Sequence, residues 1–300
     1  MKKKTYLIAL MAMALTLGSC SDNENGIGGE TSKYITVSTS IGNMTRVATD
    51  EKGGQTFEEG DEISVYAWTG DATVAPETRE RVVNNAINKL TNGSWVSTPQ
   101  MLWKNNRDKH YFIGVYPISA ISDLSTGEYT FDETKQVESD LLVAVNKDGL
   151  SYNVDEQQTV PLTFTHVMAK LAVNLTYKNQ WGGIPTVEKV VVGNAAKEAT
   201  INYLTKVVTP SATAKEDFSL PEITENTKYV SVIIPQEDVK QLTIVIGGKN
   251  FVYDNGTPFK LESGKITTVN LEVGRDEIKL GDVKITDWEN GSTFSGEALN

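Results

Sequence analysis

Short segments in which apolar and polar residues alternate recur along most of the chain. In residues 34–41, Ile35, Val37, Thr39 and Ile41 share one face, while Thr and Ser residues occupy the other. Successive side chains of a strand point to opposite faces, so this pattern predicts a half-buried strand. A turn at Gly60-Asp61 then leads into a second predicted strand, residues 63–68. We therefore expect strands from the start of the folded part.

The same kind of segment continues to the C-terminus. Further predicted strands cover residues 110–116, 171–177, 187–192, 229–234, 242–246, 249–253, 266–273 and 278–285. Asn92-Gly93 predicts a tight hairpin turn. Residues 79–90 fit a helix or a strand. Runs this short, rich in β-branched residues and separated by turns, predict an all-β chain built from β-sandwiches.

The first twenty residues have a different composition and predict export. Three lysines at positions 2–4 precede an apolar run, residues 7–15, that is too short for a permanent membrane span. The sequence Leu17-Gly18-Ser19-Cys20 then resembles the lipobox of bacterial lipoproteins. That resemblance implies a signal peptide at residues 1–19 and acyl chains on Cys20, which hold a protein firmly when there are two or three of them.

A polar stretch follows Cys20 and predicts a tether over residues 20–32. Its acidic residues resemble the surface-export signal of Bacteroidetes lipoproteins, which implies an outer-membrane lipid anchor at the cell surface. Removal of the first 19 of 300 residues leaves 281 and takes away three lysines, so the formal net charge moves from −11 to −14. Such acidity argues against nucleic acid as a partner. Cys20 is the only cysteine, so disulfide bonds cannot stabilise the fold.

Several short motifs in order resemble the fimbrillin family of Bacteroidales. They are Thr45-Arg46, Phe57 shortly before Gly60-Asp61, the aromatic strand ending in Tyr116-Pro117, Asp140-Leu141-Leu142, the pattern Leu162-x-Phe164-x-His166-x-x-Ala169-Lys170, and the C-terminal Asp287-Trp288. The resemblance implies two tandem transthyretin-like β-sandwich domains. We place the boundary near residue 160, which gives an N-terminal domain of residues 33–160 and a C-terminal domain of residues 161–300.

The family resemblance also implies a function. It predicts a structural or adhesive subunit of a fimbria (pilus), whose partners are other fimbrial subunits or copies of itself, with a host or bacterial surface receptor as a further partner. A trypsin-like protease would cut after Arg46 and remove the first strand. An extended segment of another subunit, for which residues 278–285 are the best candidate, would replace that strand. The alternative is that Arg46 is an ordinary solvated loop residue and residues 34–41 are a permanent strand. Shaft, tip and anchor subunits all fit.

Other classes of function find less support. With only two histidines and no free thiol, a nucleophilic enzyme would need His110 or His166, and His166 lies in the motif Leu162-x-Phe164-x-His166, whose alternation predicts a strand. We expect no enzyme activity, cofactor or metal site. The alternative is a non-fimbrial surface lipoprotein that binds glycans, with a stacking platform among Trp68, Trp95, Trp103, Trp181 and Trp288. Packing of these tryptophans against a sheet is favoured over that platform.

Overall fold

The computed structural model describes residues 33–42, 56–156 and 158–288, all of which belong to one compact unit. The strands are β1 (Thr36–Ile41), β2 (Glu62–Thr69), β3 (Arg81–Thr91), β4 (Ser94–Thr98), β5 (His110–Tyr116), β6 (Gly127–Thr130), β7 (Leu142–Leu150), β8 (Thr159–His166), β9 (Ala169–Tyr177), β10 (Val187–Ala196), β11 (Glu198–Asn202), β12 (Val207–Pro210), β13 (Lys215–Leu220), β14 (Glu222–Thr224), β15 (Lys228–Ile233), β16 (Gln241–Ile246), β17 (Lys249–Asp254), β18 (Lys265–Val273) and β19 (Ile278–Asp287). Two 3-10 turns, Thr78–Glu80 and Asn179–Trp181, are the only helical segments in this part of the chain. Neither is long and apolar enough to cross a membrane.

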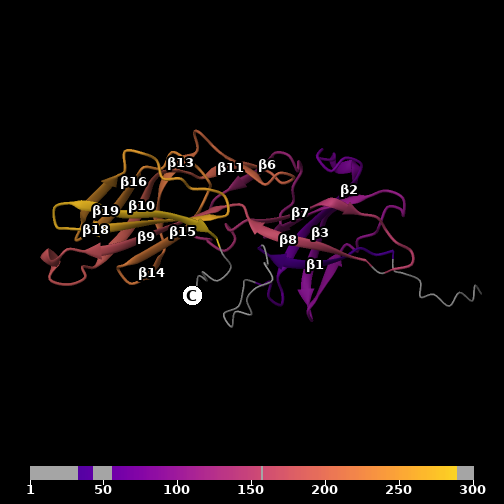
Figure 1. Ribbon diagram of the computed structural model, residues 1–300, viewed down its shortest axis with the longest axis horizontal. Helices are drawn as coiled ribbons and strands as arrows, with labels where there is room; N and C mark the ends of the chain where they lie inside the picture. Colours follow the sequence, from indigo (N-terminus) through magenta and orange to yellow (C-terminus); the bar gives the residue numbers. More distant parts are fainter. Residues whose placement is uncertain (1–32, 43–55, 157, 289–300) are drawn as a thin grey trace, which may run out of the picture. The chain divides into compact units, whose positions relative to one another are not determined.

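Seven strands form the sheet of the N-terminal half, in the order β1-β8-β7-β5-β2-β3-β4. Figure 1 labels five of them, β1, β2, β3, β7 and β8. The strand pairs of this sheet are antiparallel except for β1 and β8, which run parallel. Strand β2 lies between β5 and β3, and its six residues from Ile63 to Trp68 are all buried. A strand that is covered on both faces can carry a continuous apolar run in place of alternation.

The two faces of this sheet belong to two hydrophobic clusters. The first cluster gathers Ile35, Val37, Ile41, Ile63, Val65, Ala67, Val83, Ala86, Met101, Trp103, Phe112, Leu142, Ala144, Val160, Leu162 and Phe164. The opposite face contributes Tyr66, Trp68, Ile113, Val115 and Val143 to the second cluster, which continues into the C-terminal half. The central strands β2, β5 and β7 therefore divide their apolar side chains between the two clusters, whereas the buried apolar residues of β1, β3 and β8 belong to the first cluster alone.

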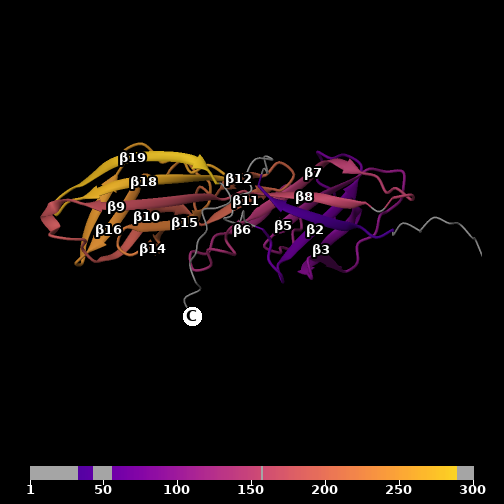
Figure 2. The same cartoon turned by 60° about the horizontal axis from the view of Figure 1, so that its bottom comes forward.

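Two further sheets form a sandwich in the C-terminal half. Their strand orders are β14-β15-β9-β18-β19 and β13-β10-β16-β17, and β9 and β18 run parallel (Figure 2). The second cluster contains apolar side chains from both sheets, including Leu171 and Val173 of β9, Val192 of β10, Leu242 of β16 and Leu271 of β18. Sheets that share a core in this way form a β-sandwich. The predicted all-β sandwich class is confirmed.

Most predicted strands are confirmed within one or two residues. The ambiguous residues 79–90 form β3 after a 3-10 turn, and Asn92-Gly93 makes the predicted hairpin turn, with φ of 51° and 73°. The strands that were not predicted are β4, β6, β7, β11, β12, β13 and β14. All of them except the nine-residue β7 contain six or fewer residues, and β6, β11, β13 and β14 are largely polar. Such strands depend on their neighbours for pairing more than on their own composition.

The domain boundary stays a prediction. Residue 160 lies inside β8, which pairs with β1 and β7 of the seven-stranded sheet and so belongs with the N-terminal half. Only two residues separate β8 from β9 of the C-terminal sandwich. In addition, β6 pairs with β11, and this small sheet joins residues from both sides of the predicted boundary.

Candidate functional site: the seat of the first strand

The first strand is held along its whole length by β8. Six consecutive residue pairs join them, from Thr36–Thr159 to Ile41–Phe164. We use the name β1 seat for what β1 covers: residues 159–164 of β8, the segment 101–103, and the side chains of Phe57 and Trp95. These residues lie beside β1 in the first cluster or pair with it directly.

The residues that lead into β1 are also bonded, to segment 101–103. The Ile35 N–H donates to the Met101 carbonyl at 3.0 Å, and the Trp103 N–H donates to the Lys33 carbonyl at 3.1 Å. Further along, the indole N–H of Trp95 donates to the Thr39 hydroxyl oxygen at 3.0 Å. Sequence reasoning missed segment 101–103, whose only signal is three apolar residues between a proline and a polar loop.

The predicted inner face of β1 is confirmed. Ile35, Val37 and Ile41 are 2%, 6% and 9% exposed, whereas Thr36 and Ser38 are exposed. Full burial of one such aliphatic side chain is worth about 1.5–3 kcal/mol. The burial of these three side chains adds to the hydrogen bonds along β1, whose net contributions are about 1 kcal/mol each.

An aromatic cluster lies on the floor of the β1 seat. The ring of Phe57 makes edge-to-face contacts with Trp95, Tyr116 and Phe164, at centroid distances of 5.3, 5.4 and 5.1 Å. Phe57 and Tyr116 both come from motifs that carry the family resemblance. Their position beside β1 shows that these motifs contribute to the surface on which the first strand lies.

The ends of the segment that follows β1 meet at Phe164. At one end the Gly42 N–H donates to the Phe164 carbonyl at 2.8 Å, and at the other the Phe57 ring packs on the Phe164 ring. The connecting residues, 43–55, lie outside the described residues, and Arg46 is among them. Cys20 also lies outside the described residues. One cut within residues 43–55 would separate β1 from the remaining strands without breaking any of them.

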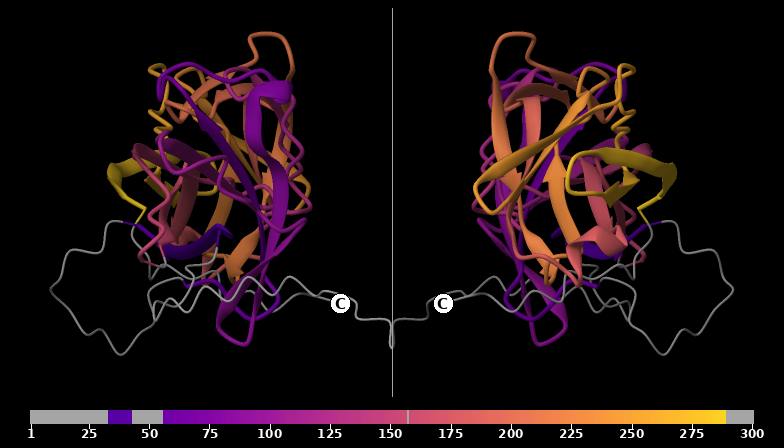
Figure 3. Two further views of the ribbon diagram at one scale, coloured as in Figure 1. Left: turned by 90° about the vertical axis from the view of Figure 1, so that its right-hand side faces the viewer. Right: turned by 90° about the vertical axis from the view of Figure 1, so that its left-hand side faces the viewer.

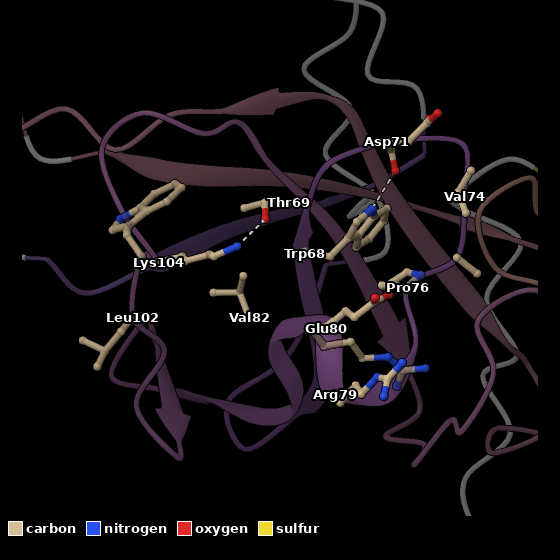
Figure 4. A pocket seen from close by; sticks show the side chains of 13 residues that line it. Trp68, Thr69, Asp71, Val74, Pro76, Arg79, Glu80, Val82, Leu102 and Lys104 are labelled. Atoms are coloured by element: carbon tan, nitrogen blue, oxygen red, sulfur yellow. Dashed lines mark hydrogen bonds between the residues drawn. The ribbon is translucent and has the colours of Figure 1, made fainter.

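A groove of about 770 Å³ opens beside the end of β2 and shares Leu102 and Trp103 with the β1 seat (Figure 4). Its lining mixes Val82 and Leu102 with Arg79, Glu80 and Lys104, and Lys104 donates to the Thr69 hydroxyl at 3.1 Å. Trp68 and Trp103 border it, but they are only 1% and 7% exposed. Their ring faces are therefore not available for a sugar to stack on.

The other tryptophans are also engaged in packing. Trp288 is 7% exposed, Trp95 is half-buried in the β1 seat, and Trp181 is half-buried with its N–H bonded to the Val273 carbonyl. The preferred interpretation, in which the tryptophans pack against sheets, is confirmed. They are distributed over both clusters, so the glycan-binding alternative gains no support from them.

Both histidines have structural partners. His110 Nε2 accepts a hydrogen bond from the Lys104 N–H at 3.0 Å, so its Nδ1 is the nitrogen that can donate to the Asp108 carbonyl at 3.1 Å. Burial lowers the pKa of His110, so this imidazole is neutral at pH 7. His166 pairs with Asp140. Within the ranges that the structure describes, no three His, Cys, Asp or Glu side chains are grouped as metal ligands.

Comparison with known proteins relates this architecture to bacterial surface fibres. A family model described as fimbrillin-like matches residues 45–288. The "Putative fimbrium subunit Fim1C" of Bacteroides uniformis is 24% identical over 322 aligned positions, which cover 99% of this chain and all of that protein.

Two crystal structures, each of a "putative cell adhesion protein", share the fold. The one from Bacteroides ovatus has a TM-score of 0.64 at 18% identity and covers 85% of this chain and 98% of that one. The one from Bacteroides uniformis has a TM-score of 0.59 at 18% identity and covers 86% and 100%.

Proposed function

The chain belongs to the fimbrillin-like family, and on that premise we propose that it is a structural or adhesive subunit of a cell-surface fimbria that assembles by strand exchange. In this proposal the subunit is exported as a lipoprotein through acylation of Cys20. Proteolysis after Arg46 then removes β1, and an extended segment of another subunit takes its place.

The observation that carries the proposal is the way β1 is attached. It is an edge strand that runs parallel to β8, and the chain connects it to the other described strands only through residues 43–55. All other strands stay joined to one another after a cut in that segment. The chain is therefore arranged so that one strand can be exchanged while the rest of the fold is kept.

Loss of β1 would leave an acceptor groove that is costly to expose. Val160, Leu162 and Phe164 of β8 are at most 1% exposed while β1 is present, and the backbone of β8 pairs with β1 along six residues. An unpaired strand edge beside apolar side chains favours the addition of another strand. A donor with alternating apolar residues would satisfy both the backbone and the apolar side chains of the groove.

The C-terminal strand has the properties expected of a donor. β19 is an edge strand that pairs only with β18, and its residues from Lys279 to Asp287 are exposed. A register shift at Gly281 puts Ile278, Leu280, Val283 and Ile285 on the same side as the buried residues of β18. Leu280, Val283 and Ile285 nevertheless remain 38–40% exposed. In a neighbouring groove they could be buried more fully than they are here.

Limited digestion tests the proposal. The full-length protein, solubilised in detergent, is treated with an arginine-specific protease, because Lys52 lies in the same segment as Arg46. N-terminal sequencing should identify cleavage after Arg46, and electrophoresis without boiling should show a ladder of oligomers. The Arg46→Ala variant should give neither.

The matched control is Arg79→Ala, since the Arg79 side chain is 80% exposed and is not one of the residues of the β1 seat. It should form the ladder like the unmodified protein. Cleavage after Arg46 that yields only monomers would contradict self-assembly by strand exchange and would leave an anchor, tip or non-fimbrial role.

A further inference from the structure

Three motifs that lie far apart in the sequence meet at the end of the C-terminal strand. His166 Nδ1 lies 2.8 Å from Asp140 Oδ1, and the His166 ring stacks on the indole of Trp288 with a centroid distance of 3.9 Å and an angle of 6°. The Nζ of Lys170 lies 4.0 Å from the centroid of the same indole. We use the name indole cradle for Asp140, His166 and Lys170.

The indole cradle buries polar groups at a physical cost. Lys170 is 3% exposed, and the His166 side chain is 4% exposed, with its Nε2 buried and without a hydrogen-bond partner among the described residues. Burial lowers the pKa of Lys170 to about 8, against the opposing effect of Asp140. The ammonium form still predominates at pH 7, so a cation faces the indole ring. Such a contact is worth about 2 kcal/mol or more when it is removed from water.

Backbone hydrogen bonds place Trp288 in the cradle. Its N–H donates to the Gly264 carbonyl at 3.0 Å, and the Gly264 N–H donates to the Met168 carbonyl at 2.8 Å. Met168 lies in the two-residue link between β8 and β9. Trp288 is thus bonded, through Gly264, to the link where the seven-stranded sheet passes into the C-terminal sandwich.

The strand that leads into Trp288, β19, is much more exposed than Trp288 itself. β19 forms the margin of its sheet, and Figure 3 shows this yellow strand with no other strand beyond it. Its residues are exposed apart from the half-buried Ile278, whereas Trp288 is 7% exposed. A tryptophan buries roughly 150–250 Å² of surface. Trp288 is therefore buried far more completely than Leu280, Val283 and Ile285 of the strand that precedes it.

We propose that the indole cradle is a binding site for an indole side chain, that it fastens β19 through Trp288, and that withdrawal of Trp288 is the step that frees the strand. The use of the freed strand as a donor rests on the proposed function. The fastening itself is a property of the single subunit and does not depend on assembly.

Hydrogen exchange on the uncleaved full-length protein tests the fastening. In Trp288→Ala, the amides of β19 should exchange at least tenfold faster than in the unmodified protein, while those of β16 keep their protection. Trp95→Ala removes a tryptophan from the first cluster and should leave β19 unchanged. Unchanged exchange of β19 in Trp288→Ala, or an equal acceleration in β16, would overturn the proposal.

Two more measurements separate a binding site from general packing. Lys170→Met keeps an unbranched side chain but removes the cation, and it should accelerate β19 exchange by a smaller factor than Trp288→Ala does. Free indole should raise the Tm of Trp288→Ala saturably and leave that of Trp95→Ala unchanged. Absence of both effects would contradict a site for an indole. These measurements use monomers, so their failure is distinct from failure of the oligomer ladder in the digestion experiment.

Discussion

Gly114 of β5 lies directly beneath the ring of Phe164 in β8. A Cβ on Gly114 would stand 2.6 Å from the Cζ of Phe164, which is closer than two non-bonded carbon atoms can approach. Phe164 is fully buried, and its ring also packs on Phe57. The absence of a side chain at residue 114 therefore creates the space for the aromatic floor of the β1 seat.

Gly114→Ala should destabilise the protein. The Phe164 ring cannot move away without displacing Phe57, and overpacking of this kind costs about 1–3 kcal/mol. Gly193→Ala is the matched control, because its nearest neighbour is the flexible end of Gln241 at 3.2 Å. Urea denaturation should show a loss for Gly114→Ala and a change within about 0.5 kcal/mol for Gly193→Ala. Equal effects would mean that the floor is not tightly packed.

Val37→Ala should weaken the hold on β1. Val37 is 6% exposed and lies in the first cluster, so the substitution should lower the free energy of unfolding by about 1–3 kcal/mol. Ser38→Ala, on the exposed face of the same strand, is the control and should change it by less than about 0.5 kcal/mol. Denaturation monitored by tryptophan fluorescence measures both, and no difference between the variants would contradict the observed orientation of the strand.

Lys170 should make stability depend on pH. Its pKa is lowered to about 8 in the folded protein, whereas that of an unfolded lysine is about 10.4. Between these values the unfolded chain binds more protons than the folded one, so the free energy of unfolding rises with pH. Below about pH 8 both states are protonated and this dependence ends.

Lys170→Met should remove that dependence. Its free energy of unfolding, minus that of the unmodified protein, should fall as the pH is raised from 8 to 9.5. Lys240→Met, at an exposed position, should show a constant difference over the same range. Urea denaturation at several pH values measures both, and a constant difference for Lys170→Met would show that the ammonium group is not buried in solution.

Cys20→Ala should abolish the lipid anchor. Cells given labelled palmitate should incorporate it into the unmodified protein and into Ser21→Ala, but not into Cys20→Ala, which should remain as an uncleaved or soluble precursor. Continued labelling and surface display of Cys20→Ala would place the anchor at another residue.

The two predicted domains can be separated to test whether each folds alone. Because β8 belongs to the seven-stranded sheet, the chain is best divided after Val167, between β8 and β9. Both parts should be soluble and β-rich by circular dichroism, although β6 and β11 would lose each other as partners. If neither part folds while the full chain does, the two halves are a single cooperative unit.

The local pattern of the sequence was enough for much of the secondary structure. Alternation in residues 34–41 predicted the buried face of β1, and the same rule located β5, β9, β16 and β18. These features depend on properties within one segment, since side-chain alternation and turn residues act over a few positions. The buried face of β1, one part of the candidate site, was therefore visible before the fold was known.

The remaining part of the site was decided only by tertiary structure. The parallel partner of β1, which is β8, lies more than one hundred residues away in the sequence. The Met101 carbonyl, which accepts a hydrogen bond from Ile35 just before β1, belongs to a segment with no strand pattern. Likewise, the motif containing His166 and Lys170 was visible as residues, but its contact with Trp288 was not. Such contacts join segments that are distant in the sequence. Bringing these segments together costs loop-closure entropy, and pairing and burial are gained only after they meet. No local pattern of the sequence therefore shows which segments will meet.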